Sequence, residues 1–330
     1  MIVHFLIQMS LGEKLKTHKM YTQALLSLFL CSSMFASCNN NSNLVGPSTG
    51  PAWTQQLQGS EIPCSCTIGS VVIVGISDAP SSRVYVVRST DDGSVWHEVA
   101  EMPVDNHSPG IHLYLDPSVT FLTDGTRVLL GIGGCNRGGI YISDDNGVNW
   151  SDNGIHWPES DFTAGAEDIN SFALPGDIIF AGTNHGVFRS TDNGANWNAL
   201  NFGLSYGSVD GIYGHAPQVM MLATMGNGIF AGTTGGGVFH SIDDGDSWIP
   251  VNNGLASQSI YGLAGIGNYI FAGAFQWSRN SIGGVFLSTN YGASWTSVDS
   301  GLTQRTVNVL ASQGRDLFAG TNDGVSVSTN

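Results

Sequence analysis

Pairs of short apolar segments recur along most of the chain, and a glycine-rich turn separates the two segments of each pair. The clearest pairs cover residues 178–190, 228–241 and 316–328. Their β-branched and aromatic residues, interrupted by glycine, are typical of a β-hairpin. Another apolar segment precedes each pair, as at 258–266 and 305–313, and a short segment follows it. We therefore predict an all-β fold built from a repeated unit of four antiparallel strands.

A short frame, Ser-x-Asp/Asn-x-Gly-x-x-Trp, follows the third strand of this unit and occurs five times. Its copies are Ser89, Asp91, Gly93, Trp96; Ser143, Asp145, Gly147, Trp150; Ser190, Asp192, Gly194, Trp197; Ser241, Asp243, Gly245, Trp248; and Ser288, Asn290, Gly292, Trp295. The acidic or amide side chain can accept backbone N–H bonds in a tight turn, and glycine allows a positive φ there. Tryptophan then begins the fourth strand and covers the turn with apolar surface. A catalytic motif is needed once, so five copies indicate a structural turn between strands three and four.

A calcium-binding loop is the functional alternative for this frame, because Asp-x-Asp/Asn-x-Gly resembles part of one. An EF-hand loop needs further ligands and ends on a glutamate, which no copy supplies. The segment Cys64-Ser65-Cys66 also has residue types that bind metals, but no histidine pair stands at ligand spacing beside it. We therefore predict neither a metal site nor a cofactor.

The spacing of the frames indicates the architecture. Their tryptophans lie 54, 47, 51 and 47 residues apart, and a period of about 40 to 50 residues is typical of a four-stranded propeller blade. Third strands that end in serine fall at residues 89, 143, 190, 241, 288 and 328. This count predicts a six-bladed β-propeller. Seven blades are the alternative, if residues 97–141 or 151–185 contain a blade with a degenerate sequence.

The two ends of the sequence suggest how such a ring closes. Residues 325–330 begin a frame without its glycine and tryptophan, whereas residues 47–57 contain a strand led by Trp53 with no strands before it. We expect this N-terminal segment to be the outer strand of the last blade, because closure in this way removes a free sheet edge. One monomeric propeller domain would then cover residues 51–330.

The first residues differ in composition from the repeats. All three lysines of the chain precede the apolar segment 24–36, and small residues then lead to Cys38. These features form a secretory signal peptide, which we place at residues 1–37 with Met20 as an alternative start. Cys38 after Phe-Ala-Ser resembles the lipidated cysteine of a bacterial lipoprotein, and 38–50 is a flexible tether. We expect a cell-envelope lipoprotein or, alternatively, a secreted protein.

Charge and cysteine content limit the binding partners and the disulfides that the sequence allows. From Cys38 onward the chain has 8 arginines, no lysine and 25 acidic residues, which is a net charge of −17. This balance argues against binding to nucleic acid or to an anionic membrane surface, since both are negatively charged. Cys64 and Cys66 are too close in sequence to pair readily with each other. Either can pair with Cys135 in an exported protein.

The repeated frame resembles the Asp-box, or BNR, repeat of a family of β-propellers, and the resemblance covers about residues 47–330. That family includes sialidases, xyloglucan-degrading glycoside hydrolases, sortilin-type receptors and photosystem II stability/assembly factors. The stretch from Phe180 to Trp197, FAGTNHGVFRSTDNGANW, looks most like the last group and its bacterial relatives. Sialidases of this family clamp a carboxylate with three arginines and carry an Arg-Ile-Pro motif. This sequence has no such motif, so we do not expect sialidase activity.

Two long loops, at 151–168 and 274–284, hold our candidate ligand-binding residues. The strand order places them on the face opposite the frames, where members of the family bind ligands. The candidates are Trp277, Arg279, His156, Trp157, Glu159 and Asp161. Exposed tryptophans on loops often contact sugars or proteins. We predict a non-catalytic binding or scaffold module for a protein or a carbohydrate on this face; the alternative is a glycoside hydrolase with two catalytic carboxylates.

Overall fold

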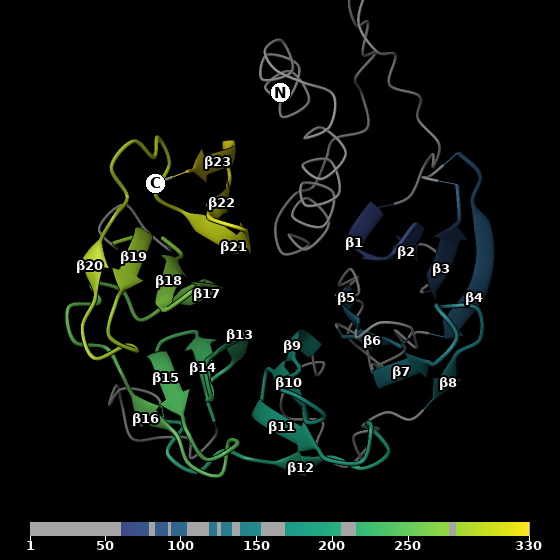
Figure 1. Ribbon diagram of the computed structural model, residues 1–330, viewed down its shortest axis with the longest axis horizontal. Helices are drawn as coiled ribbons and strands as arrows, with labels where there is room; N and C mark the ends of the chain where they lie inside the picture. Colours follow the sequence, from purple (N-terminus) through teal and green to yellow (C-terminus); the bar gives the residue numbers. More distant parts are fainter. Residues whose placement is uncertain are drawn as a thin grey trace, which may run out of the picture.

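Six antiparallel β-sheets make up the part of the chain that the computed structural model describes, which is residues 61–78, 83–91, 94–103, 119–123, 127–133, 139–152, 169–205, 216–276 and 282–329. Figure 1 shows the sheets side by side around a common centre, in the order of the sequence. The fold is therefore a β-propeller, and its six blades confirm the count made from the serine-ended strands. These ranges contain no helix.

Each blade is a meander whose strands follow one another from the centre of the propeller to its rim. Blades 1 and 2 contain β1 (Glu61–Ile68), β2 (Val71–Asp78), β3 (Arg83–Ser89), β4 (His97–Pro103), β5 (Val119–Thr123), β6 (Val128–Ile132), β7 (Gly139–Ser143) and β8 (Ser151–Asp152). Blades 3 and 4 contain β9 (Ile169–Ala173), β10 (Ile179–Thr183), β11 (Gly186–Ser190), β12 (Asn198–Ala199), β13 (Val219–Met225), β14 (Gly228–Thr233), β15 (Gly237–Ser241) and β16 (Ile249–Pro250). Blades 5 and 6 contain β17 (Ile260–Ile266), β18 (Tyr269–Ala274), β19 (Gly284–Ser288), β20 (Thr296–Ser297), β21 (Val307–Gln313), β22 (Asp316–Thr321) and β23 (Gly324–Ser328).

The second strand of a blade is buried on both of its faces. Every residue of β6, β10 and β14 is buried, because a neighbouring blade covers each side of the sheet. This explains why these strands have continuous apolar sequences and not an alternation of apolar and polar residues. The outer strands β8, β12, β16 and β20 contain two residues each, and such short edges limit pairing with other molecules.

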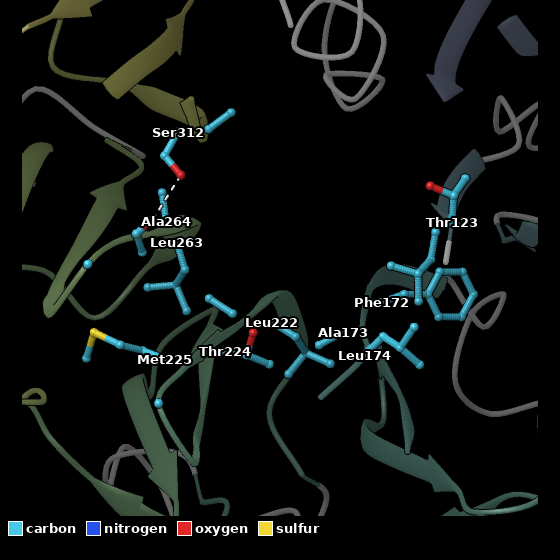
Figure 2. A pocket seen from close by; sticks show the side chains of 16 residues that line it. Thr123, Phe172, Ala173, Leu174, Leu222, Thr224, Met225, Leu263, Ala264 and Ser312 are labelled. Atoms are coloured by element: carbon cyan, nitrogen blue, oxygen red, sulfur yellow. Dashed lines mark hydrogen bonds between the residues drawn. The ribbon is translucent and has the colours of Figure 1, made fainter. Parts of the chain in front are cut away.

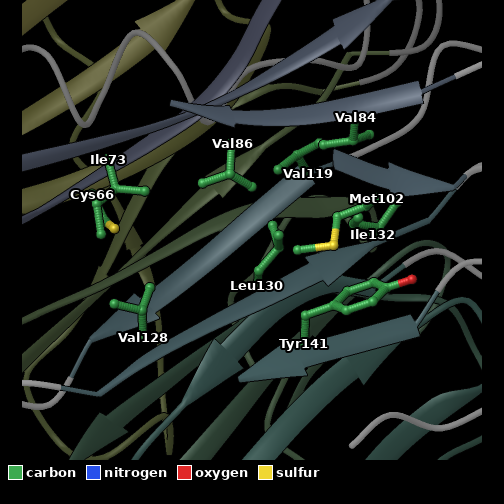
Figure 3. Packing of buried hydrophobic residues seen from close by; sticks show 10 residues of the cluster. All are labelled: Cys66, Ile73, Val84, Val86, Met102, Val119, Val128, Leu130, Ile132 and Tyr141. Atoms are coloured by element: carbon green, nitrogen blue, oxygen red, sulfur yellow. The ribbon is translucent and has the colours of Figure 1, made fainter. Parts of the chain in front are cut away.

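The hydrophobic core lies between the blades. Figure 3 shows one part of it, in which Ile73 and Val86 of blade 1 face Val128 and Leu130 of blade 2. Burying one such side chain fully contributes about 1.5–3 kcal/mol. Because each interface joins strands from two blades, a blade is stabilised mainly by its neighbours.

A glycine in the second strand lets the next blade approach closely. In five blades, an added Cβ at this position would lie 2.6–2.8 Å from an atom of the first strand of the following blade. The pairs are Gly75 with Val119, Gly131 with Ile169, Gly182 with Val219, Gly232 with Ile260 and Gly273 with Val307. The glycine of the repeated Phe-Ala-Gly sequence therefore has a packing role, which any larger side chain would disrupt.

Several sequence predictions fall outside the described residues: the signal peptide, Cys38, the tether and the closing strand at 47–57. In the part of the chain that is described, no helix is long and apolar enough to span a membrane.

Cys66 is a free, buried thiol, and burial raises its pKa to about 12. Of the two disulfides left open by the sequence, the one through Cys66 is therefore not formed.

Candidate functional site

The five frames form one turn with a repeated set of hydrogen bonds. In each, the Oγ of the first serine donates to Oδ1 of the Asp or Asn two residues later, at 2.7–2.9 Å. That Oδ1 accepts the backbone N–H of the residue four positions on, at 2.8–3.0 Å. All five serines are buried. The hydrogen bonds of the serine and of the Asp or Asn thus stabilise the closed turn.

The frame carboxylates are occupied by these bonds. The backbone N–H and side chain of Asn149 hold the pKa of Asp145 at about 2, with smaller help from Ser143. The side-chain and backbone bonds from Ser247 hold the pKa of Asp243 at about 2 as well. Hydrogen bonds to the charged form stabilise it. These aspartates are therefore poor candidates for an acid or base, which needs a pKa near the working pH.

The residue before the frame glycine adopts a left-handed conformation, which is unusual for a residue with a side chain. It has φ between 54° and 60° at Asn146, Asn193, Asp244 and Tyr291. Glycine follows with φ between 79° and 87° in the same four frames. Three of the four are Asn or Asp, which tolerate this region best. Tyr291 tolerates it less well, and the frame hydrogen bonds hold it there.

The frame tryptophans link neighbouring blades in part of the ring. Trp248 Nε1 donates to the Leu200 carbonyl of blade 3 at 3.0 Å, and Trp295 Nε1 donates to the Val251 carbonyl of blade 4 at 2.6 Å. The indole of Trp197 instead donates to Gly194 in its own frame at 3.0 Å. The frame is therefore a contact between blades as well as a turn within one.

Two arginines add a second contact of this kind. Arg88 Nε donates to the Asn146 carbonyl in the frame of blade 2 at 2.9 Å. Arg189 donates to the Asp244 carbonyl at 2.7 Å and pairs with Asp246 at 2.8 Å in the frame of blade 4. Both arginines thus cap a turn of the next blade, which is a structural role.

On the face opposite the frames, the side-chain amide of an asparagine forms two hydrogen bonds to the turn between strands two and three. This contact was not predicted from the sequence. Asn201 accepts the Val187 N–H through Oδ1 at 2.9 Å and donates to the His185 carbonyl at 3.0 Å. Asn252 makes the same two bonds to Val238 and Gly236 in blade 4. Each amide fixes the turn between strands two and three to the segment after strand four. In both blades the Asn stands four residues after the frame tryptophan. This spacing is the sequence signal that could have predicted the contact.

A cavity of about 590 Å³ lies at the centre of the propeller, where the first strands of blades 2 to 6 end. Figure 2 shows its wall from close by. The lining residues are Leu122, Thr123, Phe172, Ala173, Leu174, Leu222, Ala223, Thr224, Met225, Gly226, Leu263, Ala264, Gly265, Gly267, Ala311 and Ser312. None of these residues carries a charge, and three hydroxyl groups are the polar side chains of the wall.

The cavity lies at the frame end of the channel. In an antiparallel meander, the first and third turns lie at the same end of the sheet. Gly226 and Gly267, from the first turns of blades 4 and 5, line the cavity. A Cβ added at Gly226 would lie 3.9 Å from the ring of Tyr291 in the frame of blade 5. The cavity and the frames are therefore on the same face, and the loops that hold our sequence candidates connect strands at the other face.

Small side chains repeat around the channel. Alanine occupies the same register position in four first strands, opposite the phenylalanine of the second strand. The pairs are Ala173 with Phe180, Ala223 with Phe230, Ala264 with Phe271 and Ala311 with Phe318. Sequence reasoning missed these alanines, because each becomes visible as part of a ring only after the strands are paired.

All six candidate ligand-binding residues, from His156 to Arg279, lie outside the described residues, so their prediction stays untested. Within the described ranges, no group of three or more His, Cys, Asp or Glu side chains is placed to hold a metal ion.

The frames also match a known repeat. A family model described as the BNR/Asp-box repeat matches residues 141–152, which include the frame of blade 2. The chain is a β-propeller with Asp-box repeats. No curated protein matches the chain.

Two solved glycoside hydrolases share this propeller fold. One is the GH74 enzyme of Niastella koreensis, with a TM-score of 0.56, 14% identity, and coverage of 80% of this chain and 44% of that one. The other is AFV00434, an ancestral GH74 enzyme, with a TM-score of 0.57, 17% identity, and coverage of 84% and 38%. The propeller thus spans less than half the length of either enzyme. At these identities the likeness shows the fold alone.

A third structure, titled YCF48 bound to D1 peptide, has a TM-score of 0.49 and 14% identity and covers 78% of this chain and 76% of that one. In that structure the protein is bound to the D1 peptide. A TM-score of this size carries no argument for the propeller described here.

Proposed function

We propose that this propeller is a non-catalytic binding module, and that its ligand is a protein held at the uncharged central cavity. The cavity is the observation that carries the proposal. It is concave, it lies where the first strands of five blades meet, and its size falls within the usual range of ligand sites, roughly 300–1,000 Å³. A wall without charged groups suits the burial of neutral protein surface.

The glycoside hydrolase alternative finds no support among the described residues. Two carboxyl groups about 5 to 10 Å apart are needed for glycosidic hydrolysis. The cavity wall contains neither Asp nor Glu, and the frame carboxylates Asp192 and Asp243 are held in turn hydrogen bonds. Glu159 and Asp161, which the sequence offers as candidate ligand-binding residues, lie outside the described residues.

A matched pair of arginine substitutions tests the site. Thr224 is exposed and lines the cavity, whereas Ser300 is exposed on the face opposite the frames. The immobilised mature domain is incubated with envelope extract, and the proteins retained are quantified by mass spectrometry. Thr224→Arg should reduce retention of the specific partner at least about tenfold, because a charged side chain would have to be buried with it. Ser300→Arg should retain it.

The opposite pattern would contradict this assignment. If Ser300→Arg abolishes retention and Thr224→Arg does not, the ligand lies on the face first predicted from the sequence. If both variants retain every protein that the unmodified domain retains, the cavity is not the site.

We further propose that the propeller is exported and anchored through Cys38. The support is the sequence alone: a basic segment, an apolar segment and a small-residue approach to cysteine. Cys38→Ala should move the protein from the membrane fraction to the soluble fraction on ultracentrifugation, since one lipid-bearing residue is lost. An unchanged distribution between the two fractions would refute the anchor.

A further inference from the structure

The first strand of each blade presents one backbone edge to the centre of the propeller. β13, β17 and β21 each pair with a single strand, so one row of their N–H and C=O groups has no strand partner. In β13, Met225 and Gly228 face each other across a two-residue turn, and the pair that flanks such a turn is hydrogen-bonded. Alternation along the strand then directs the backbone groups of Leu222 and Thr224 toward the channel.

Two hydrogen bonds show that polar groups from neighbouring blades bind this inward edge. Leu222 N–H donates to Ser171 Oγ of blade 3 at 3.1 Å. Ser312 Oγ of blade 6 donates to the Gly265 carbonyl at 2.9 Å, drawn as a dashed line in Figure 2. Gly265 and Thr224 occupy equivalent positions, one residue before the closing pair of their hairpins. The Gly265 carbonyl is thus covered by a side chain from the next blade.

Among the described residues, no side chain donates a hydrogen bond to the Thr224 carbonyl in this way. The residue of blade 5 at the position of Ser312 is Gly265, which has no hydroxyl to donate. A Cβ added at Gly265 would lie 3.5 Å from the Thr224 carbonyl oxygen, so the space for a donor is present beside it. Thr224 itself is exposed at the cavity. Among the described residues, none hydrogen-bonds to the inward N–H or C=O of Thr224.

We propose that an extended, uncharged segment of a partner protein enters the cavity and adds as a strand to the inward edge of β13 at Thr224. The inference rests on the proposed function and specifies which part of the partner binds and how. Strand addition joins alternate N–H and C=O groups of the two chains. The small side chains of Ala223 and Ala264, which line the same cavity, leave room for a second backbone.

The chemistry of the wall favours a peptide over other ligands. A charged ligand would lose its hydration without gaining an ion pair, because no lining residue is charged. A sugar is commonly held against an exposed aromatic face, and the aromatic residue of this wall, Phe172, is buried. An uncharged peptide supplies one donor and one acceptor per residue, which matches a strand edge.

The test uses the mature chain and a library of uncharged, fluorescein-labelled decapeptides, with binding measured by fluorescence anisotropy. For a bound peptide, Thr224→Pro should weaken binding about tenfold, because proline removes the inward N–H and leaves the β13–β14 bonds intact. Thr224→Ala keeps that N–H and should bind within about twofold of the unmodified chain. N-methylation of alternate peptide residues should abolish binding in one register and spare it in the other.

A second pair of variants acts on the carbonyl and does not introduce proline. Gly265→Ser should place a hydroxyl beside the Thr224 oxygen, as Ser312 does for Gly265. It should weaken the peptide about tenfold, whereas Gly265→Ala, which adds the Cβ alone, should weaken it about twofold. Circular dichroism of all four variants confirms that the propeller is intact.

Equal peptide affinity of Thr224→Pro and Gly265→Ser with their alanine controls would overturn strand addition. Failure of every peptide to bind would overturn it too, including the case in which neutral oligosaccharides bind instead. If no peptide binds while Thr224→Arg still abolishes retention of the partner, the proposed function stands and this inference alone falls.

Discussion

Replacement of Gly254 by alanine is expected to lower the free energy of unfolding by about 3 kcal/mol or more. Gly254 has a φ of 83°, and alanine in the left-handed region costs about 1–2 kcal/mol. The added Cβ would also overlap the carbonyl oxygen of Trp295 in the next blade. That oxygen has little freedom to move, since the Trp295 N–H donates to the Asn253 carbonyl at 2.9 Å.

Gly301 provides a matched control within the same protein. It stands six residues after a frame tryptophan, as Gly254 does, and has a φ of 93°. Among the described residues, no atom lies within 4 Å of the position that its Cβ would take. Gly301→Ala should therefore cost only the backbone strain, about 1–2 kcal/mol.

Urea unfolding followed by circular dichroism measures both variants, and an unchanged m-value shows that the two losses can be compared. Equal losses at Gly254 and Gly301 would show that contact with the neighbouring blade is not the cause. A large loss at Gly254 alone would show that stability in this ring depends on contacts between blades more than on individual turns.

The fold could be predicted from the sequence because the repeat shows both the residues of its turns and the length of each blade. The frame from Ser190 to Trp197 indicates a turn by residue type, and its period indicates a blade. The structure shows all six blades. The repeat does not show which residue of a neighbouring blade each side chain contacts. The sequence assigned Trp248 to its own turn, whereas its indole donates to Leu200 of the preceding blade.

The cavity was harder to predict for a physical reason. Sequence reasoning searches for side chains that carry chemistry, and it selected Trp277, Arg279 and the acidic loop. Most residues of the cavity wall are alanines, leucines, glycines and hydroxyl residues, which carry no charge and give no local signal in the sequence. The groups that matter at Thr224 are backbone groups, which every residue has. Their direction depends on strand register, and a single sequence does not show it.

Substitution of Trp248 by alanine is the second large expected effect, at about 4 kcal/mol of unfolding free energy. Trp248 is only 2% exposed and packs among Leu204, Phe239 and their neighbours in the core between blades 3 and 4. Its loss would leave a cavity at that interface. It would also leave the partly buried Leu200 carbonyl without the indole donor, which adds a further cost.

Trp197 is the comparison residue, because it holds the same position in the frame of blade 3. Its indole donates within its own turn, to Gly194, and the side chain is half-buried. Trp197→Ala should therefore cost about 2 kcal/mol, roughly half the loss at Trp248. Trp248→Phe keeps most of the apolar contact and removes the donor, so it should cost about 1–3 kcal/mol.

Far-UV circular dichroism in urea is the suitable measurement here, since substitution of tryptophan changes the fluorescence itself. If Trp197→Ala destabilises the propeller as much as Trp248→Ala, the frame tryptophan acts through its own turn and the contact between blades is incidental. If Trp248→Phe is neutral, the indole hydrogen bond contributes nothing and shape alone explains the tryptophan. The expected order, Trp248→Ala above Trp248→Phe and Trp197→Ala, follows only if the frame joins one blade to the next.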